Sequence, residues 1–293
     1  MKSPAAEIYA QVVEDLQQAE KLLCDKKPEP GRAGKGTTKS ILAEVYLNMT
    51  GWPIKDHSYY QLAAGKAKEV LDNLELFGFG LIEDFTDLWP NDSVNNDGNK
   101  EEVFTLNFWA EDWENANALY GQGARPHEDG GWDIFFSELT FFNEFPDEYR
   151  KEITFLTELE DVTIWEDFTS KHPYFAKMRG PEPEWQNQIS LPLERLAEVY
   201  LVFAEAQVIA TGNPRDPDAL EAVNKIVQRG AGLPPNKSNV SVDWISATQE
   251  QIVHEKAWEF AGEFCRWFDL VRLEMVEEVV EKNIRMICNH CIR

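Results

Sequence analysis

Apolar residues recur at helical spacing near both ends of the chain, and this regular spacing is lost between them. One run extends from Ile8 to Leu23 and a later one from Leu196 to Val208, with apolar residues three or four positions apart. Such residues share one face of an α-helix, so each run predicts a helix that packs this face against a neighbour. The chain is therefore expected to fold as packed helices.

Local composition divides the expected single domain, residues 1–293, into three parts. Helical repeats ended by Gly and Pro clusters predict one scaffold in residues 1–76 and another in residues 191–293. Residues 77–190 are rich in Gly, Asn, Asp, Pro and aromatics, which is typical of long connections, and only EEVFTLNFW indicates a strand. We predict an all-α fold of antiparallel helix pairs that resemble tetratricopeptide repeats, with long irregular loops.

Capping signals predict where several helices begin. Ser58 precedes Gln61, and Thr248 precedes Gln251, at the spacing of a capping box. The pair Asp216-Pro217 supplies an N-cap followed by proline at the first helical position. The last helix is predicted to run without a break from about Thr248 to about Val280.

Charge and hydropathy restrict the possible partners. The 52 acidic residues exceed the 28 basic ones, and the formal charge of −24 would repel nucleic acid and anionic lipid surfaces. No run approaches the roughly 20 apolar residues of a membrane helix, and the start MKSPAAEIYA lacks the apolar stretch of a signal peptide. Because a helix is predicted almost from Met1, we expect the native protein to start further upstream.

Histidine, cysteine and acidic residues do not form a complete metal motif. His254 opens a segment like HExxH, but Trp258 replaces the second histidine, and the chain has no ExxH pair. Cys288 and Cys291 form one CxxC pair near the chain end, without the second pair of a four-cysteine zinc site. The loop of residues 91–99 is rich in oxygen ligands but lacks the first Asp and the closing Glu of an EF-hand. We expect no metal and no cofactor.

The segment HEKAWEFAGEFCRWFDLVR, residues 254–272, mixes aromatic and charged side chains. We interpret it as a structural helix whose aromatic stripe packs inward. At a spacing of three residues, Glu263 can meet Arg266 and Asp269 can meet Arg272. The stripe comprises Phe260, Phe264, Trp267, Phe268 and Leu270.

Glu205 lies among apolar helical neighbours such as Leu201 and Val208, so we predict that it is at least partly buried. A buried carboxylate requires a partner, which predicts an ion pair with an arginine. Arg266 is the predicted partner and Arg195 the alternative. A general acid with a raised pKa is the competing hypothesis for Glu205.

Residues 104–136 combine aromatic side chains with carboxylates and amides. Sugar rings present apolar C–H faces and hydroxyl rims, so an exposed aromatic platform flanked by such polar groups suits them. The alternative is that these rings pack the loops onto the helices. The predicted ligand-binding residues are Trp109, Glu111, Asp112, Trp113, Asn115, Tyr120 and Trp132.

Several separate stretches, in order, resemble the SusD/RagB family of surface nutrient-binding lipoproteins of Bacteroidetes. The similarity extends over most of residues 7–272. It is carried by IYAQVVEDLQQAEKLL, GRAGKGTTKSILAEVYL, SYYQLAAGKAKEVLDN, DFTDLW, FPDEYRKEITFLT, PYFAKM, ISLPLERLAEVYLVFAEAQ and EKAWEFAGEFCRWFDLVR.

The resemblance implies a helical scaffold whose loops bind an oligosaccharide, with an oligopeptide as the alternative ligand. It also implies delivery to a TonB-dependent SusC-like transporter and a place on the cell surface, through an N-terminal lipid anchor in the outer membrane. The family's lipidated cysteine, first helical segment and C-terminal tail are not in this chain, which we interpret as truncated at both ends.

Two further functions are possible from the residues alone. The helix pairs could form a protein-interaction scaffold that has no small ligand. A glycoside hydrolase would need two carboxylates flanking one sugar site, and no paired-acid motif is evident. We therefore expect a binding protein that is not an enzyme.

Overall fold

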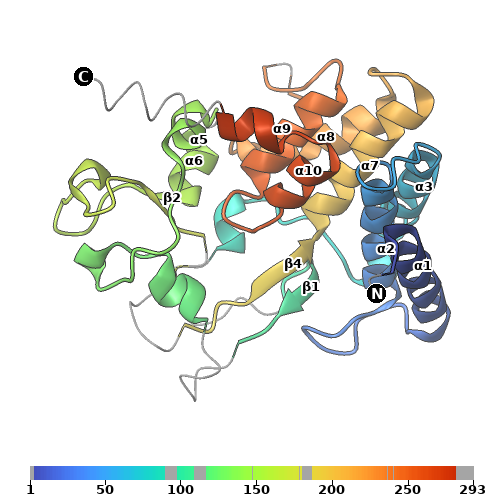
Figure 1. Cartoon of the computed structure of the whole chain (residues 1–293), viewed down its shortest axis with the longest axis horizontal. Coiled ribbons are helices and arrows are strands. Elements are labelled where there is room, and N and C mark those ends of the chain that lie inside the picture. The colour runs from blue at the N-terminus through green and yellow to red at the C-terminus, as the bar shows by residue number, and fades with distance from the viewer. Residues whose placement is uncertain are drawn as a thin grey trace.

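The computed structural model describes residues 3–89, 98–108, 117–146, 148–177, 179, 187–235, 237–239 and 241–281. Within these ranges the fold is mostly helical, as predicted (Figure 1). The CxxC pair of Cys288 and Cys291 lies outside the described residues, as does most of the oxygen-rich loop, residues 91–97.

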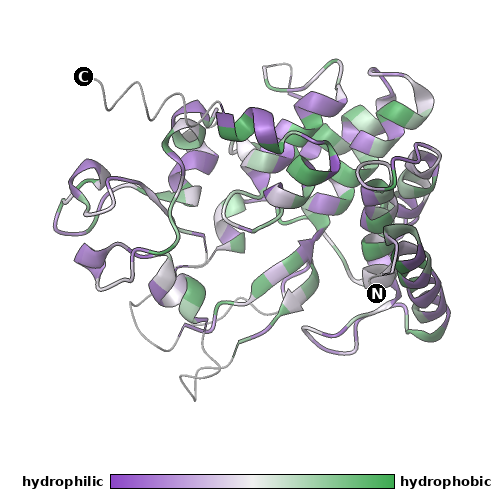
Figure 2. Ribbon diagram, viewed as in Figure 1, coloured by the Kyte–Doolittle hydropathy of each residue, from purple (hydrophilic) through white to green (hydrophobic). Residues whose placement is uncertain are grey.

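The scaffold is built from seven helices that come from both ends of the chain. Helices α1, α2, α3 and α7 pack side by side in that order, and α8 and α9 pack on α7 (Figure 1). Hydrophobic and hydrophilic residues occur together along these helices, as amphipathic packing requires (Figure 2). Their bounds are α1 Ala5–Leu22, α2 Lys35–Met49, α3 Tyr59–Leu71, α7 Leu196–Thr211, α8 Pro217–Gly230, α9 Gln249–Glu259 and α10 Arg266–Arg272.

The middle of the chain contributes short elements joined by loops. Strand β1, Glu102–Leu106, confirms the strand predicted there, and it pairs antiparallel with β4, Leu191–Arg195, which was not predicted. A second pair joins β2, Phe155–Leu156, to β3, Tyr174–Phe175. The short helices are α4 Leu74–Phe77, α5 Leu139–Glu144 and α6 Glu148–Thr154, with helical turns at Phe85–Leu88, Leu119–Gly123, His127–Asp129 and Trp165–Asp167.

The predicted helix starts are confirmed at all three positions, but the capping box predicted at Ser58 is absent. Asp216 caps α8 by accepting from the Ala219 amide, and Thr248 caps α9 in a capping box with Gln251. The Ser58 hydroxyl instead donates to Asp56 at 2.7 Å, so it does not cap α3.

The final helix is not continuous, contrary to the prediction. Helix α9 ends at Glu259, and α10 begins at Arg266. Between them Gly262 has φ +82° and Phe264 has φ +65°, a left-handed conformation that ends an α-helix. The break changes the direction in which α10 presents its side chains.

The core has one large cluster in the scaffold and smaller clusters under the loops. The large cluster joins α2, α3, α7 and α8 through residues such as Leu42, Ala63, Leu201 and Val223. An aromatic cluster around Phe155 joins β2, α5 and the turn after α9. No helix in the described part of the chain combines the length and hydropathy that a bilayer crossing requires.

Candidate functional site

Four acidic and four basic side chains meet in the interior, where the middle of the chain contacts the C-terminal helices; we refer to them as the balanced network. Each is at most 4% exposed. They are Glu101, Glu255, Glu259, Glu263, Arg150, Lys177, Arg195 and Arg229.

Glu259 lies at the centre of the balanced network. Its Oε1 accepts from Arg195 and Arg229 at 2.6 Å each, and its Oε2 accepts from Arg150 at 2.9 Å. Burial alone would raise the pKa of Glu259, but the three arginines outweigh it and hold that pKa far below its usual range. Burial also lowers the pKa of Lys177 to about 8, although Glu263 opposes the change.

The balanced network joins distant parts of the sequence. Lys177 donates to Glu263 at 2.8 Å, and Arg195 donates to both Glu263 and Glu101, at 2.7 and 2.9 Å. Arg150 comes from α6 and Glu259 from α9, so the network holds the loop-rich middle against the helices. A buried charge without its partner is strongly unfavourable, so each pair fixes the relative position of two segments.

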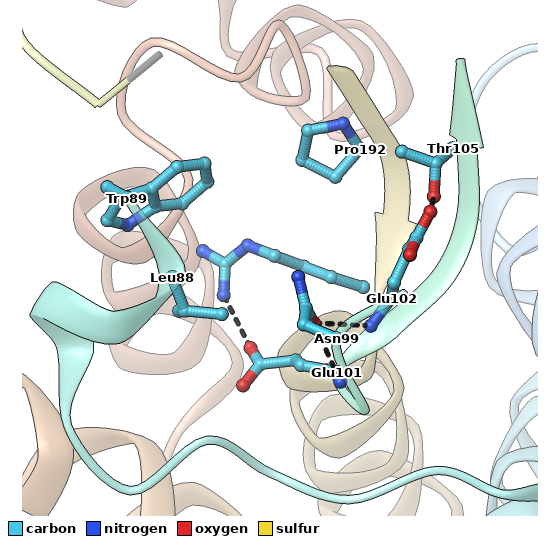
Figure 3. A pocket seen from close by; sticks show the side chains of 8 residues that line it. Leu88, Trp89, Asn99, Glu101, Glu102, Thr105 and Pro192 are labelled. Carbon is cyan, nitrogen blue, oxygen red and sulfur yellow. Dashed lines mark hydrogen bonds and ion pairs between the residues drawn. The ribbon is translucent and has the colours of Figure 1, made fainter. Parts of the chain in front are cut away.

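The space beside Glu101 has no room for a substrate. The cavity beside Arg195 is lined by Leu88, Trp89 and Glu101 and has a volume of about 10 Å³ (Figure 3). That space is close to the minimum for one water molecule. The glutamates of segment 254–272 are held in buried ion pairs, which supports the structural role that its sequence predicted.

The predicted inward packing of the aromatic stripe is wrong for three of its residues. Phe264, Trp267 and Phe268 are 44%, 58% and 61% exposed, whereas Phe260 and Leu270 are buried as predicted. The glutamates of this segment face inward because their arginine and lysine partners are buried there. The aromatic rings on the other side consequently face solvent.

Glu205 is fully buried, as predicted, but its predicted partner is wrong. Arg272 donates to both carboxylate oxygens, at 2.8 and 2.6 Å, and Gln249 donates to one at 2.8 Å. Arg266 instead donates to the Val253 carbonyl. The helix is interrupted between α9 and α10. For this reason the side chain of Arg272, rather than that of Arg266, reaches Glu205 on α7.

Of the two ion pairs predicted within segment 254–272, one is confirmed and the other is wrong. Asp269 accepts from Arg272 at 2.9 Å, which confirms that pair. Glu263 pairs with Lys177 and Arg195 and not with Arg266. The alternative partner of Glu205, Arg195, belongs to the balanced network.

The turn that carries Trp132 has a firmly held backbone. The amides of Trp132 and Phe135 donate to the carbonyls of Gln122 and Gly123, both at 2.9 Å. Buried Arg125 donates to Asp129 at 2.9 Å inside the turn. Gly131 packs so closely on the Arg125 carbonyl that a Cβ atom there would overlap it.

This turn presents apolar side chains to solvent. Trp132, Ile134 and Phe136 are 46%, 64% and 36% exposed, and we call these three residues the Trp132 surface. Phe135, between them in sequence, packs inward against Tyr120 and Phe264, with ring centroids 5.8 and 5.0 Å apart. The fixed backbone therefore holds exposed apolar groups in one place, an arrangement typical of a binding surface.

The residues predicted to bind a ligand differ in whether the structure leaves them accessible to solvent. Trp132 is exposed, as a ligand residue must be. Tyr120 is fully buried and its hydroxyl donates to the Gly262 carbonyl, so its predicted ligand contact is wrong. The remaining predicted residues, Trp109, Glu111, Asp112, Trp113 and Asn115, lie outside the described residues.

The sequence interpretation did not identify Ile134 and Phe136 as exposed. The alternation of apolar residues at positions 132, 134 and 136 is the signal that could have indicated them. This alternation is hidden in the sequence because Phe135, between Ile134 and Phe136, is apolar as well.

Replacing Tyr120 by phenylalanine tests its structural role. We expect the free energy of unfolding to fall by about 1–2 kcal/mol, because the partly buried Gly262 carbonyl loses its donor. Urea denaturation measures this change. Tyr59→Phe, on the partly buried start of α3, is the control and should change stability by less than about 0.5 kcal/mol. An unchanged stability of the Tyr120 variant would contradict the assignment.

The chain is similar to proteins of the SusD family. The model of the SusD family matches residues 81–286. SusD-like protein P2 of Formosa agariphila is 27% identical, and the alignment covers 96% of this chain and 59% of that protein. The chain therefore spans little more than half the length of this relative.

Solved structures show the same fold. The crystal structure of a SusD homolog from Bacteroides thetaiotaomicron aligns with a TM-score of 0.79 at 19% identity, over 97% of this chain and 62% of that one. A laminarin binding SusD-like protein aligns with a TM-score of 0.77 at 20% identity, over 97% of this chain and 64% of that one.

Proposed function

The chain belongs to the SusD family, and from this premise we propose that it binds oligosaccharides without transforming them. It then passes them to a TonB-dependent SusC-like transporter in the outer membrane. We place the protein on the cell surface, attached through a lipid anchor upstream of the present sequence. The Trp132 surface is the observation that carries the proposed ligand site.

The chemistry of the Trp132 surface suits a sugar. An exposed indole offers a flat apolar face on which the C–H face of a sugar ring can stack. Because the backbone of the turn is held by hydrogen bonds to residues 122 and 123, little conformational freedom is lost when a ligand binds. The similar fold of the laminarin binding SusD-like protein supports an oligosaccharide as the ligand.

We propose that further ligand contacts come from the segment before this turn. Trp109 and Trp113 would add aromatic faces, and Glu111, Asp112 and Asn115 would accept or donate hydrogen bonds at the hydroxyl rim. The exposure of Trp132 favours ligand binding over a scaffold that only grips a protein partner.

Replacing Trp132 by alanine tests the proposed site. We expect the affinity for the oligosaccharide to fall about tenfold or more, because truncating an aromatic anchor typically removes 2 kcal/mol or more. Isothermal titration calorimetry with laminarin oligosaccharides and a panel of other oligosaccharides measures the change.

Trp52 supplies the matched control, since it is 50% exposed and lies between α2 and α3 on the scaffold. Trp52→Ala should bind like the unmodified protein. Equal affinity of the Trp132 variant and the unmodified protein would refute the site. Saturable binding of peptides, with no oligosaccharide bound, would instead make the protein an oligopeptide-binding member of the family.

A further inference from the structure

A second group of buried charges lies beside the balanced network, and it contains more acids than bases. We call it the acid-rich cluster. Its members from α2, β4, α7, α9 and α10 are Glu44, Glu194, Glu198, Glu205, Lys256, Asp269 and Arg272.

The two bases of this cluster are engaged by three of its acids. Arg272 binds Glu205 at 2.6 Å and Asp269 at 2.8 Å. Lys256 lies 3.3 Å from Asp269 and 3.3 Å from Glu198. The carboxylates of Glu44, Glu194 and Glu198 therefore share Lys256, which also faces Asp269. Glu198 in addition faces Arg195, and Glu44 has a hydrogen bond with Asn48.

The pKa values reflect this shortage of positive charge. Burial, followed by the charge of Glu198, raises the pKa of Glu44 to about 8, although Lys256 opposes the change. Burial and the charges of Glu44 and Glu198 raise the pKa of Glu194 well above its usual value. The Oε2 atom of Glu194 has no hydrogen-bond partner, and this residue is only 4% exposed.

A pocket connects this cluster with solvent. It has a volume of about 130 Å³, and Glu44 and Glu198 line it together with Leu193, Phe264 and Phe268. Glu198 is buried and Glu44 is partly buried, whereas Leu193, Phe264 and Phe268 are exposed, so Glu198 lies deepest and the apolar side chains surround the mouth. Ligand pockets for small molecules usually measure about 300–1,000 Å³, so this one suits a single side chain.

The shape and charge of this pocket complement a lysine. A lysine side chain is an aliphatic stem that ends in a cation, and the stem packs readily on apolar surface. Among the described residues no group of acids, histidines and cysteines has the geometry to hold a metal ion. The exposed rings of Phe264, Trp267 and Phe268 form an apolar surface of the kind that contacts proteins.

We propose that this pocket is a docking site for a lysine side chain of a protein partner, whose ammonium group contacts Glu198 and Glu44. The aliphatic part of the lysine packs between Leu193, Phe264 and Phe268. The apolar surface around the mouth contacts the residues that flank the lysine in the partner. The site does not depend on the proposed oligosaccharide site.

The test uses n-butylammonium chloride, which has the same stem and cation as a lysine side chain. We expect saturable changes in the backbone amide NMR signals of Phe264 and Cys265, and no such changes with n-butanol. Glu198→Gln should weaken n-butylammonium binding about tenfold, because a buried carboxylate partner of the cation is removed. Glu221→Gln, an exposed acid on α8, and Trp132→Ala should leave the binding unchanged.

Two further measurements of n-butylammonium binding test the proposal independently: substitutions of apolar residues at the mouth of the pocket, and the dependence of binding on pH. Phe268→Ala should weaken n-butylammonium binding severalfold, whereas Ile245→Ala, another exposed apolar residue, should not change it. Binding should strengthen from pH 6 to pH 9, because the bound cation favours the ionised form of Glu44. The titratable groups that face Glu44 are Tyr9, Glu194, Glu198, Lys256, Cys265 and Asp269.

Three results would overturn the proposal. The first is the absence of saturable signal changes, and the second is equal binding of n-butanol. The third is stronger binding of calcium ions than of n-butylammonium at the same residues, which would make the pocket a metal site. Equal affinity of the Glu198 and Glu221 variants would also refute the role of Glu198.

Discussion

Glu259→Gln is expected to lower the free energy of unfolding by about 3–5 kcal/mol. Glutamine keeps the shape of the side chain but removes the charge that three buried arginines contact. Their remaining partners, such as Glu101 and Glu255, are already engaged. A protein of this kind is stable by about 5–15 kcal/mol, so the loss is a large share of the total.

Urea denaturation followed by circular dichroism at pH 7 measures this effect. Glu250→Gln is the matched control, because Glu250 is exposed on the same helix and should contribute no more than about 0.5 kcal/mol. Since the pKa of Glu259 is lowered, its stabilisation is present above about pH 4.5 and is lost in acid. Similar effects of the two substitutions would contradict the central place of Glu259.

Glu44→Gln is expected to act in the opposite direction. In the folded protein Glu44 has a pKa of about 8, against 4.5 as the ordinary value, so it keeps a proton that the unfolded chain releases. The stability of the unmodified protein should therefore fall as the pH rises from about 4.5 to about 8. Glutamine cannot ionise and removes this penalty.

The expected gain for Glu44→Gln is about 2 kcal/mol at pH 9 and close to zero at pH 5, after allowance for the partial exposure of Glu44. Denaturation of both proteins at several pH values between 5 and 9 measures it. Glu14→Gln, on the exposed side of α1, should show no such pH-dependent gain. A loss of stability at pH 9 would contradict the raised pKa of Glu44 in the folded protein.

Local signals predicted the scaffold because its helices are specified by neighbouring residues. The apolar repeat from Leu196 to Val208 forms α7, and Asp216 and Thr248 start α8 and α9 as expected. The paired strand β1 was found for the same reason. Its partner β4 was missed because Leu191–Arg195 contains Pro192, which disfavours a strand assignment.

The orientation of the segment 254–272 could not be predicted from periodicity. A helical pattern with aromatics on one side and acids on the other normally buries the aromatics. Here the buried partners of Glu259 come from α6, β4 and α8, which are distant in sequence. Only the tertiary structure brings them together, and the same arrangement exposes the aromatic mouth of the lysine pocket.

The exposure of the residues predicted to bind a ligand followed only partly from the sequence. The density of aromatics indicated residues 104–136, and Trp132 is exposed there. Tyr120 has the same composition around it, but its contact with Gly262 depends on the break after α9. Exposure of a single ring is set by such distant contacts and not by local composition.

Hydrogen-exchange mass spectrometry with and without a bound oligosaccharide tests most directly whether the loops capture the ligand while the helices only support them. We expect slower exchange in peptides that contain residues 117–136 when the oligosaccharide is bound, and unchanged exchange in α2, α3 and α7. Slower exchange confined to these scaffold helices, with none around Trp132, would contradict this division of roles.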